Sequence, residues 1–146
     1  MDAILDELSH IALVVADPKR TAALFQKLFD APVVNRIDED GHDETLIRLG
    51  KTWFQLAIAR IQPQRTGDHI AFYVTEEGLR TTLTKLQDLQ MEYILARGDT
   101  ALYFFDYDNH LFELDTVGMA ELGTNRDRGM NSRELNETGV SSKKGE

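Results

Sequence analysis

The pattern of apolar and polar positions over residues 8–117 predicts short strands interrupted by two helices. The run 8–15 is typical of a strand, and it ends at Asp17 and Pro18, which suit a helix N-cap and a first-turn proline. The helix that begins there should end near Phe29, because its apolar positions recur at helical spacing. Three further strands are expected at 32–35, 44–49 and 52–58.

The second half of the chain repeats this order. After a linker at 60–67, the pattern predicts a strand, a helix, a strand and a hairpin, at 68–74, about 77–90, 91–95 and 102–117. The sequence itself also returns, since His-Ile-Ala-Leu-Val-Val at 10–15 matches His-Ile-Ala-Phe-Tyr-Val at 69–74. Trp-Phe-Gln-Leu at 53–56 likewise matches Leu-Phe-Glu-Leu at 111–114. Such a repeat predicts an α+β fold of two βαβββ modules in a pseudo-twofold arrangement that forms a shared cleft.

One domain is expected over residues 1–117, built from modules at about 8–59 and 68–117. From residue 118 on, the sequence is rich in asparagine, arginine, serine and glycine and has no apolar period. Such a segment buries too little apolar surface to offset the entropy of ordering it. We therefore expect a polar, disordered C-terminal tail at 118–146.

Composition narrows the possible partners and chemistry. The 146-residue chain contains no cysteine, so any metal ion would be held by histidine nitrogen and carboxylate oxygen. The formal net charge of −9 falls on residues 1–117, which disfavours nucleic acid and anionic membranes as partners. No apolar run approaches the roughly 20 residues of a membrane-spanning helix, and the N-terminus lacks the basic start of a signal peptide. We expect a cytoplasmic protein with a small-molecule substrate.

Four polar residues occupy matching positions in the two predicted modules. His10 and His69 lie on the first strand of each module, and Gln55 and Glu113 lie on the last. Because side chains alternate along a strand, all four can point to one concave face. Glu113 lies in an otherwise apolar run, where a carboxylate is rarely buried unless it is paired or holds a metal ion. Two imidazoles and one carboxylate are a ligand set typical of catalytic divalent metal sites, so we predict His10, His69 and Glu113 as metal ligands.

Each of these residues has an ordinary explanation when it is taken singly. A strand histidine is more often hydrogen-bonded in the core or at a sheet edge, and an inward glutamate more often meets an arginine. The matching positions of the two histidines and of Glu113 favour the metal site over these explanations. His42, in a polar loop, and His110, just after a turn, are expected at the surface or behind the ligands.

The paired His-Ile-Ala strands, the duplicated order of elements and the closing Asp-Tyr-Asp-Asn-His-Leu-Phe-Glu-Leu at 106–114 resemble the vicinal oxygen chelate superfamily. That superfamily includes glyoxalase I, extradiol dioxygenases and fosfomycin-resistance enzymes, and the resemblance covers about 8–117. Within it the chain most resembles the FosX-type fosfomycin epoxide hydrolases. The similar motifs are Leu-Ser-His at 8–10, Asp-His-Ile-Ala-Phe at 68–72, and the run 103–114.

The resemblance implies roles for particular residues. His10, His69 and Glu113 would hold Mn(II), the favoured ion, although Fe, Ni, Zn or Co suits the same ligands. Glu44 matches the position of the general base that activates water against an epoxide. Arg48, on the same strand face as Glu44, is a candidate substrate contact that could also act on Glu44. The family also implies a homodimer.

The sequence departs from the FosX pattern at two places. The arginine that the hydrolases carry a few residues past the Glu113 strand has no counterpart at 117–123. The loop before the hairpin instead leaves Arg97, Thr100 and Tyr103 as candidate contacts for an anionic substrate. Gln55 stands where glyoxalase I enzymes place a fourth protein ligand, so it is expected to ligate the ion or to hydrogen-bond a water molecule.

The sequence thus favours a divalent-metal-dependent hydrolase or lyase of the vicinal oxygen chelate superfamily that hydrates an epoxide, as in FosX-type fosfomycin resistance. One alternative is a glyoxalase I-like isomerase with Gln55 as the fourth ligand. A second alternative is a non-enzymatic, drug-sequestering protein like the bleomycin-binding members, which keep the fold and lack the metal triad. The intact triad argues against sequestration.

Overall fold

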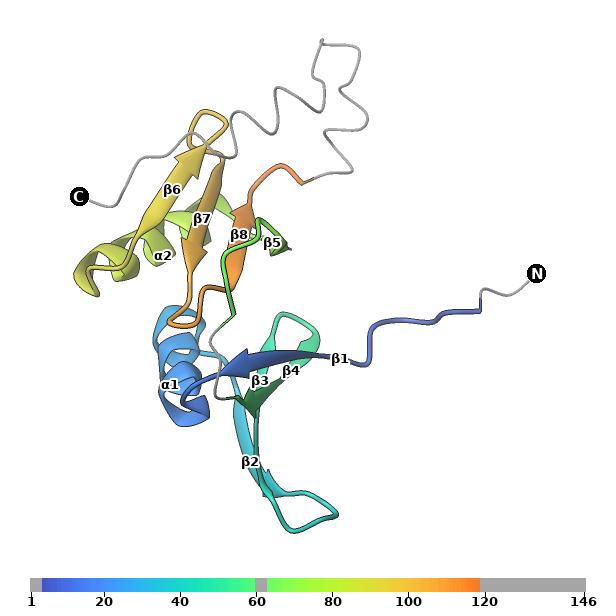
Figure 1. Ribbon diagram of the computed structural model, residues 1–146. Coiled ribbons are helices and arrows are strands. Elements are labelled where there is room, and N and C mark those ends of the chain that lie inside the picture. The colour runs from blue at the N-terminus through green and yellow to red at the C-terminus, as the bar shows by residue number, and fades with distance from the viewer. Residues whose placement is uncertain (1–3, 60–62, 119–146) are drawn as a thin grey trace. The chain divides into compact units, whose positions relative to one another are not determined.

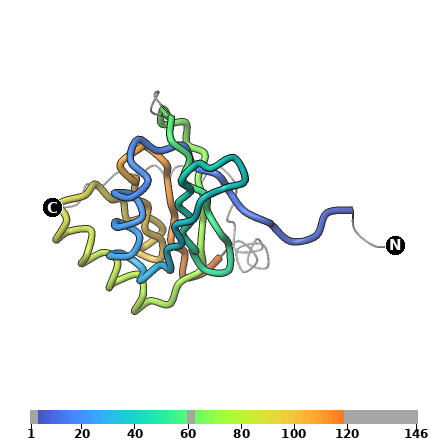
Figure 2. The backbone as a smooth tube through the Cα atoms, turned by 90° about the horizontal axis from the view of Figure 1, so that it is seen from below, coloured from blue at the N-terminus to red at the C-terminus, as the bar shows by residue number. Residues whose placement is uncertain are grey.

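The computed structural model describes residues 4–59 and 63–118, which fall in two compact units, 1–64 and 65–146. We call them the first and the second unit and describe each by itself. Each unit contains one four-stranded sheet and one helix (Figure 1). Figure 2 follows the backbone of the first unit in blue to green and that of the second in lighter green to orange.

In the first unit the strand order is β1-β4-β3-β2, with β1 parallel to β4 and the other pairs antiparallel. The helix begins after Asp17, whose carboxylate accepts a hydrogen bond from the Arg20 backbone N–H at 3.1 Å, and Pro18 takes the first helical position. The elements are β1 (His10–Val15), α1 (Pro18–Phe29), β2 (Val33–Ile37), β3 (Asp43–Leu49) and β4 (Thr52–Ile58).

The second unit repeats this topology with strand order β5-β8-β7-β6, and β5 is parallel to β8. Its elements are β5 (His69–Tyr73), α2 (Glu76–Asp88), β6 (Tyr93–Ala96), β7 (Ala101–Phe105) and β8 (Leu111–Asp115). The predicted α+β fold with two βαβββ modules is therefore confirmed.

The strand register shows that the sequence repeat is also a structural one. Ala12 pairs with Gln55 across β1 and β4, and Ala71 pairs with Glu113 across β5 and β8. The histidine at the start of each first strand precedes this alanine by two residues, so it lies on the same face, diagonal to Gln55 or Glu113. Each unit thus brings one predicted histidine ligand close to one polar residue of its last strand.

Alternation along the strands separates a buried face from a polar one. On β3, Thr45, Ile47 and Leu49 are buried, while Glu44 and Arg48 lie on the other face, as the sequence predicted. The helix α1 packs against β3 and β4 over the buried face. The fully or nearly fully buried apolar side chains include Leu24, Phe25, Ile47, Phe54 and Leu56 in the first unit and Leu79, Leu86, Leu102, Phe104 and Phe112 in the second.

The structure adjusts some of the expected limits. The first strand begins at His10 rather than at residue 8, because Ser9 and the exposed Leu8 precede the parallel pairing with β4. The helix expected to end near residue 90 ends at Asp88. The predicted tail lies outside the described residues except for Gly118. Neither helix of the described residues is long and apolar enough to cross a membrane.

The repeat makes a prediction about stability. Phe54 on β4 and Phe112 on β8 occupy matching, fully buried positions, and each contributes to the core of its own unit. Phe54→Ala and Phe112→Ala should each lower the free energy of unfolding by about 3–5 kcal/mol, measured by urea denaturation. Ile58→Ala, at an exposed position, serves as the control and should change stability by less than about 0.5 kcal/mol. A loss below about 1 kcal/mol for either phenylalanine would contradict the assigned cores.

Candidate metal and substrate site

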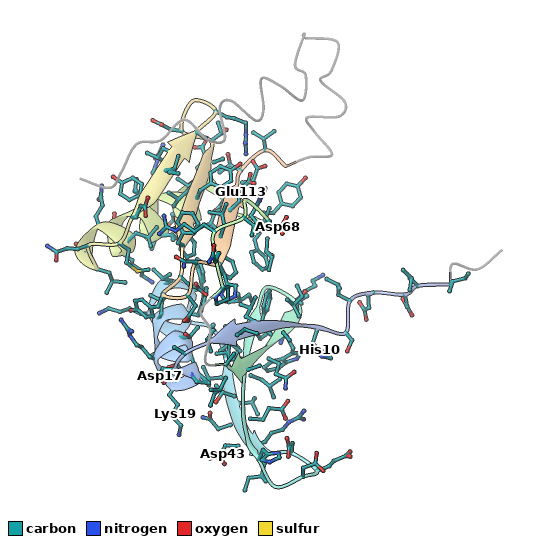
Figure 3. All side chains as sticks on the ribbon, in the orientation of Figure 1. His10, Asp17, Lys19, Asp43, Asp68 and Glu113 are labelled. Carbon is teal, nitrogen blue, oxygen red and sulfur yellow. The ribbon has the colours of Figure 1, made fainter. Side chains whose placement is uncertain are left out.

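The first unit contains a pocket of about 310 Å³ on the polar face of its sheet. It lies where β1 begins, at the position that Figure 3 labels His10. Three predicted site residues, His10, Glu44 and Gln55, line it together, and they come from β1, β3 and β4. The other lining residues are Ser9, Val34, Arg36, Leu46 and Trp53.

His10 is an exposed side chain at the rim of this pocket. Its Nδ1 lies 3.0 Å from the Ser9 hydroxyl, so one ring nitrogen has a fixed neighbour. Its Nε2 has no hydrogen-bond partner among the residues that the structure describes. A histidine held through one nitrogen while the other remains available has the arrangement of many metal-ligating histidines.

Glu44 is paired with an arginine that the sequence analysis did not single out. Arg36 lies directly opposite Glu44 across β2 and β3, and its Nε donates a hydrogen bond to Glu44 Oε2 at 2.8 Å. This hydrogen bond and the negative charge of Glu44 raise the pKa of Arg36. Arg48 shares the strand face with Glu44 but does not line the pocket. The sequence analysis missed this pair because it expected the strand to end at residue 35, whereas β2 extends to Ile37 and so includes Arg36.

In the second unit, His69 faces Glu113 on the neighbouring strand β8. The His69 Nδ1 lies 3.0 Å from the Gly67 carbonyl oxygen, and because a carbonyl can only accept, Nδ1 carries the hydrogen. The His69 Nε2 lies 3.1 Å from Glu113 Oε1. In the neutral imidazole, two lone-pair-bearing atoms would therefore face each other at this distance. A metal ion between the two atoms would accept both lone pairs.

Glu113 belongs to a buried cluster of charges. Glu113 and Asp115 lie on the same face of β8 and are only 5% and 4% exposed. Arg97 reaches both, with Nη2 2.5 Å from Glu113 Oε2 and 3.4 Å from Asp115 Oδ2. Two carboxylates against one guanidinium leave one negative charge in the cluster, and burial makes that charge costly. A cation beside Glu113 Oε1 would neutralise it.

Arg97 also fixes Tyr103. The Arg97 Nη1 donates a hydrogen bond to the Tyr103 hydroxyl at 3.1 Å, and the Tyr103 ring lies edge-on to the His69 ring. Burial raises the pKa of Tyr103, so its phenol remains a neutral donor at physiological pH. Burial alone would lower the pKa of Arg97, but the bonds with Tyr103 and Glu113 outweigh it and raise that pKa. Arg97 holds this position from a left-handed backbone conformation, with φ of 51°.

The side chains present fit a divalent ion. Imidazole nitrogen and carboxylate oxygen bind such ions at about 2.0–2.2 Å, and two ligands at a right angle are then about 3 Å apart. The separation of 3.1 Å between His69 Nε2 and Glu113 Oε1 matches that spacing. The predicted ligands are divided between the units, with His10 in the first and His69 and Glu113 in the second, and their assembly into one site stays a prediction.

The remaining candidate residues have other partners. The Thr100 hydroxyl donates to the Arg97 carbonyl at 2.8 Å, and His110 Nδ1 lies 2.7 Å from Asp106 Oδ2. His42 lies in the β2–β3 loop, where it forms with Asp38 and Asp40 a group whose spacing could suit a metal ion. Asp38 Oδ1 accepts the backbone N–H groups of residues 40 and 42, so the geometry of the loop explains this group. It includes none of the predicted ligands.

Comparison with known proteins places this geometry in context. The sequence profile of the Glyoxalase/Bleomycin resistance protein/Dioxygenase superfamily matches residues 7–114. The fosfomycin resistance protein FosX of Listeria innocua is 30% identical over 126 residues, which cover 81% of this chain and 95% of that protein. The metallothiol transferase FosB of Bacillus licheniformis is 28% identical over 118 residues, covering 75% of this chain and 74% of that protein.

Solved structures of similar proteins support the same relationship. FosX from Listeria monocytogenes with Mn(II) and sulfate ion has a TM-score of 0.72 and 28% identity, covering 84% of this chain and 99% of that chain. A glutamate-to-glutamine mutant of the same FosX, complexed with Mn(II) and 1S,2S-dihydroxypropylphosphonic acid, has a TM-score of 0.71 and 29% identity. That match covers 83% of this chain and 99% of that chain.

The buried charge cluster makes a prediction about stability. Arg97→Met would leave Glu113 and Asp115 buried without their guanidinium partner and should lower the free energy of unfolding by about 3–5 kcal/mol in metal-free protein. Arg80→Met is the matched control, because Arg80 pairs with Glu76 at an exposed helix surface and should contribute little. Urea denaturation of both variants provides the measurement. Equal effects of the two substitutions would show that Arg97 does not compensate buried charge.

Proposed function

The chain belongs to the Glyoxalase/Bleomycin resistance protein/Dioxygenase superfamily, and on that basis we propose that it is a divalent-metal-dependent enzyme that adds water to a small epoxide. The observation that carries this proposal is the placement of Glu44 in the pocket of His10. Arg36 holds Glu44 Oε2, and Oε1 has no hydrogen-bond partner within the described part of the chain. A carboxylate with one oxygen fixed and the other available is suited to accept a proton from water.

His10, His69 and Glu113 are proposed to hold the ion. Mn(II) is favoured because FosX from Listeria monocytogenes was solved with Mn(II), and Fe, Ni, Zn or Co suits the same donor atoms. The bound ion would supply Lewis acidity toward the substrate oxygen. Two further features of the chain orient these ligands, since the Gly67 carbonyl fixes the His69 ring and Arg97 fixes the Glu113 carboxylate.

Glu44 is proposed as the general base of the reaction. The attacking water gives its proton to Glu44 Oε1 while its oxygen forms a bond to an epoxide carbon, and the ring C–O bond breaks. The released oxygen then takes up a proton, so the product is a vicinal diol. The ligand of the FosX mutant structure, 1S,2S-dihydroxypropylphosphonic acid, is a diol of the kind that such a hydration yields. In the second unit, Tyr103 is proposed as a neutral hydrogen-bond donor to the substrate.

The role of Gln55 differs between the proposed hydrolase and the alternative isomerase. Gln55 lines the pocket with His10 and Glu44, and a glyoxalase I-like isomerase would use it as a fourth ligand. In the hydrolase it would instead hydrogen-bond a water molecule. The similarity to FosB adds thiol transfer to the candidate reactions, but a positioned carboxylate base favours water as the nucleophile. The homodimer implied by the family remains part of the proposal.

Glu44→Gln is the test of the base. Turnover should fall by roughly 10²–10⁴-fold, because the amide cannot accept the water proton, while metal affinity should remain nearly unchanged. The assay follows the conversion of fosfomycin to its diol by ³¹P NMR with Mn(II)-loaded protein, with and without an added thiol. Full activity in Glu44→Gln would contradict the role of the base. Product formed only with added thiol would favour transferase chemistry, and activity with a glutathione hemithioacetal alone would favour the isomerase.

Metal analysis tests the proposed ligands. Protein purified without chelator should retain about one divalent ion per chain, measured by inductively coupled plasma mass spectrometry. His69→Ala and Glu113→Gln should each weaken Mn(II) binding by at least about 10-fold, because each removes a direct ligand. His42→Ala is the control, since His42 belongs to the loop group outside the predicted ligands and should leave binding unchanged. Wild-type protein without bound metal would favour the sequestering alternative.

A further inference from the structure

Arg36 is the arginine that lines the pocket of His10 and Glu44. It extends from β2, and only its Nε is used in the hydrogen bond to Glu44. The terminal nitrogens Nη1 and Nη2 make no hydrogen bond within the part of the chain that the structure describes. The Arg36 side chain is 61% exposed, whereas Glu44 beside it is 13% exposed. The pocket therefore presents the open edge of a guanidinium to whatever enters it.

That open edge has a preferred ligand. The two terminal N–H groups of a guanidinium are parallel, and they match the paired oxygens of a phosphonate or a carboxylate. Charge favours the same class of ligand. Among the residues that line the pocket, Arg36 and Glu44 cancel each other, so a divalent ion at His10 would leave the pocket positively charged.

The other arginines considered for this role are less suited to it. Arg97 is only 9% exposed, and its terminal nitrogens are taken by Tyr103, Glu113 and Asp115. Arg48 lies on the same strand face as Glu44 but outside the pocket.

We propose that Arg36 binds the acidic group of the substrate through Nη1 and Nη2 while its Nε positions Glu44. This inference rests on the proposed function. Arg36 would then make two contacts at the same time, one with the substrate anion and one with the base Glu44. The acidic group and the attacking water would then be oriented by one rigid, planar side chain.

The test combines binding and kinetics on full-length, Mn(II)-loaded protein. Propylphosphonate is the binding probe in isothermal titration calorimetry, and fosfomycin and uncharged 1,2-epoxypropane are the substrates. Arg36→Gln should weaken propylphosphonate binding by about 10- to 100-fold and raise the KM for fosfomycin similarly, because it removes charged hydrogen bonds. Arg36→Lys should fall between wild type and Arg36→Gln, since it keeps the charge and loses the paired geometry. Arg80→Gln, at an exposed ion pair outside the pocket, is the matched control and should match wild type.

The outcomes separate this inference from the proposed function. Glu44→Gln should abolish most turnover and still bind propylphosphonate, which distinguishes the base from the anion contact. Wild-type protein that binds propylphosphonate through Arg36 without hydrating fosfomycin would support the inference and contradict the reaction. Wild-type protein that does not bind propylphosphonate, or an Arg36→Gln variant with unchanged affinity and KM, would overturn the inference. Loss of the Glu44 contact should lower kcat with both substrates, whereas loss of anion binding should raise KM only for the charged one. A KM that rises equally for fosfomycin and 1,2-epoxypropane would therefore also overturn the inference.

Discussion

The second unit depends on the compensation of two carboxylates buried on one strand. Glu113 and Asp115 point to the same face of β8, where water cannot screen their repulsion. Arg97 contacts both carboxylates. It lies in the loop between β6 and β7, where its own backbone is left-handed. The remaining negative charge favours a cation beside His69 and Glu113, the two ligands proposed in this unit. Stability and ligand chemistry therefore depend on the same few side chains.

The two units show how a repeat can diverge in function while its backbone stays the same. Gln55 and Glu113 have the same register relative to the first strand of their unit, opposite Ala12 and Ala71. The first unit keeps a neutral amide there and opens a polar pocket around it, whereas the second has a buried carboxylate. The carboxylate proposed as the base, Glu44, lies on β3, two strands away from β1, and has its own arginine partner.

The fold could be predicted from the sequence because its signals are local and occur twice. The cap at Asp17, the apolar alternation of β3 and the repeated His-Ile-Ala strands each specify an element without knowledge of the rest. The site was harder, because its contacts depend on which strands are neighbours. Arg48 was the natural partner for Glu44 by alternation along one strand, but pairing across the β2–β3 loop selects Arg36. The sequence indicated that a cation should face Glu113, yet only the fold of the 97–100 loop identifies it as Arg97.

The contact between Arg97 and Glu113 also restricts how Glu113 can bind an ion. Arg97 donates to Oε2, and the opposite oxygen, Oε1, is the one that faces His69 Nε2. A carboxylate whose second oxygen is held by a guanidinium can offer only one oxygen to a metal ion. Single-oxygen ligation takes up one coordination position instead of two, so more positions stay open for water and substrate. The arginine that stabilises the buried carboxylate would thereby also keep the proposed metal site open for water and substrate.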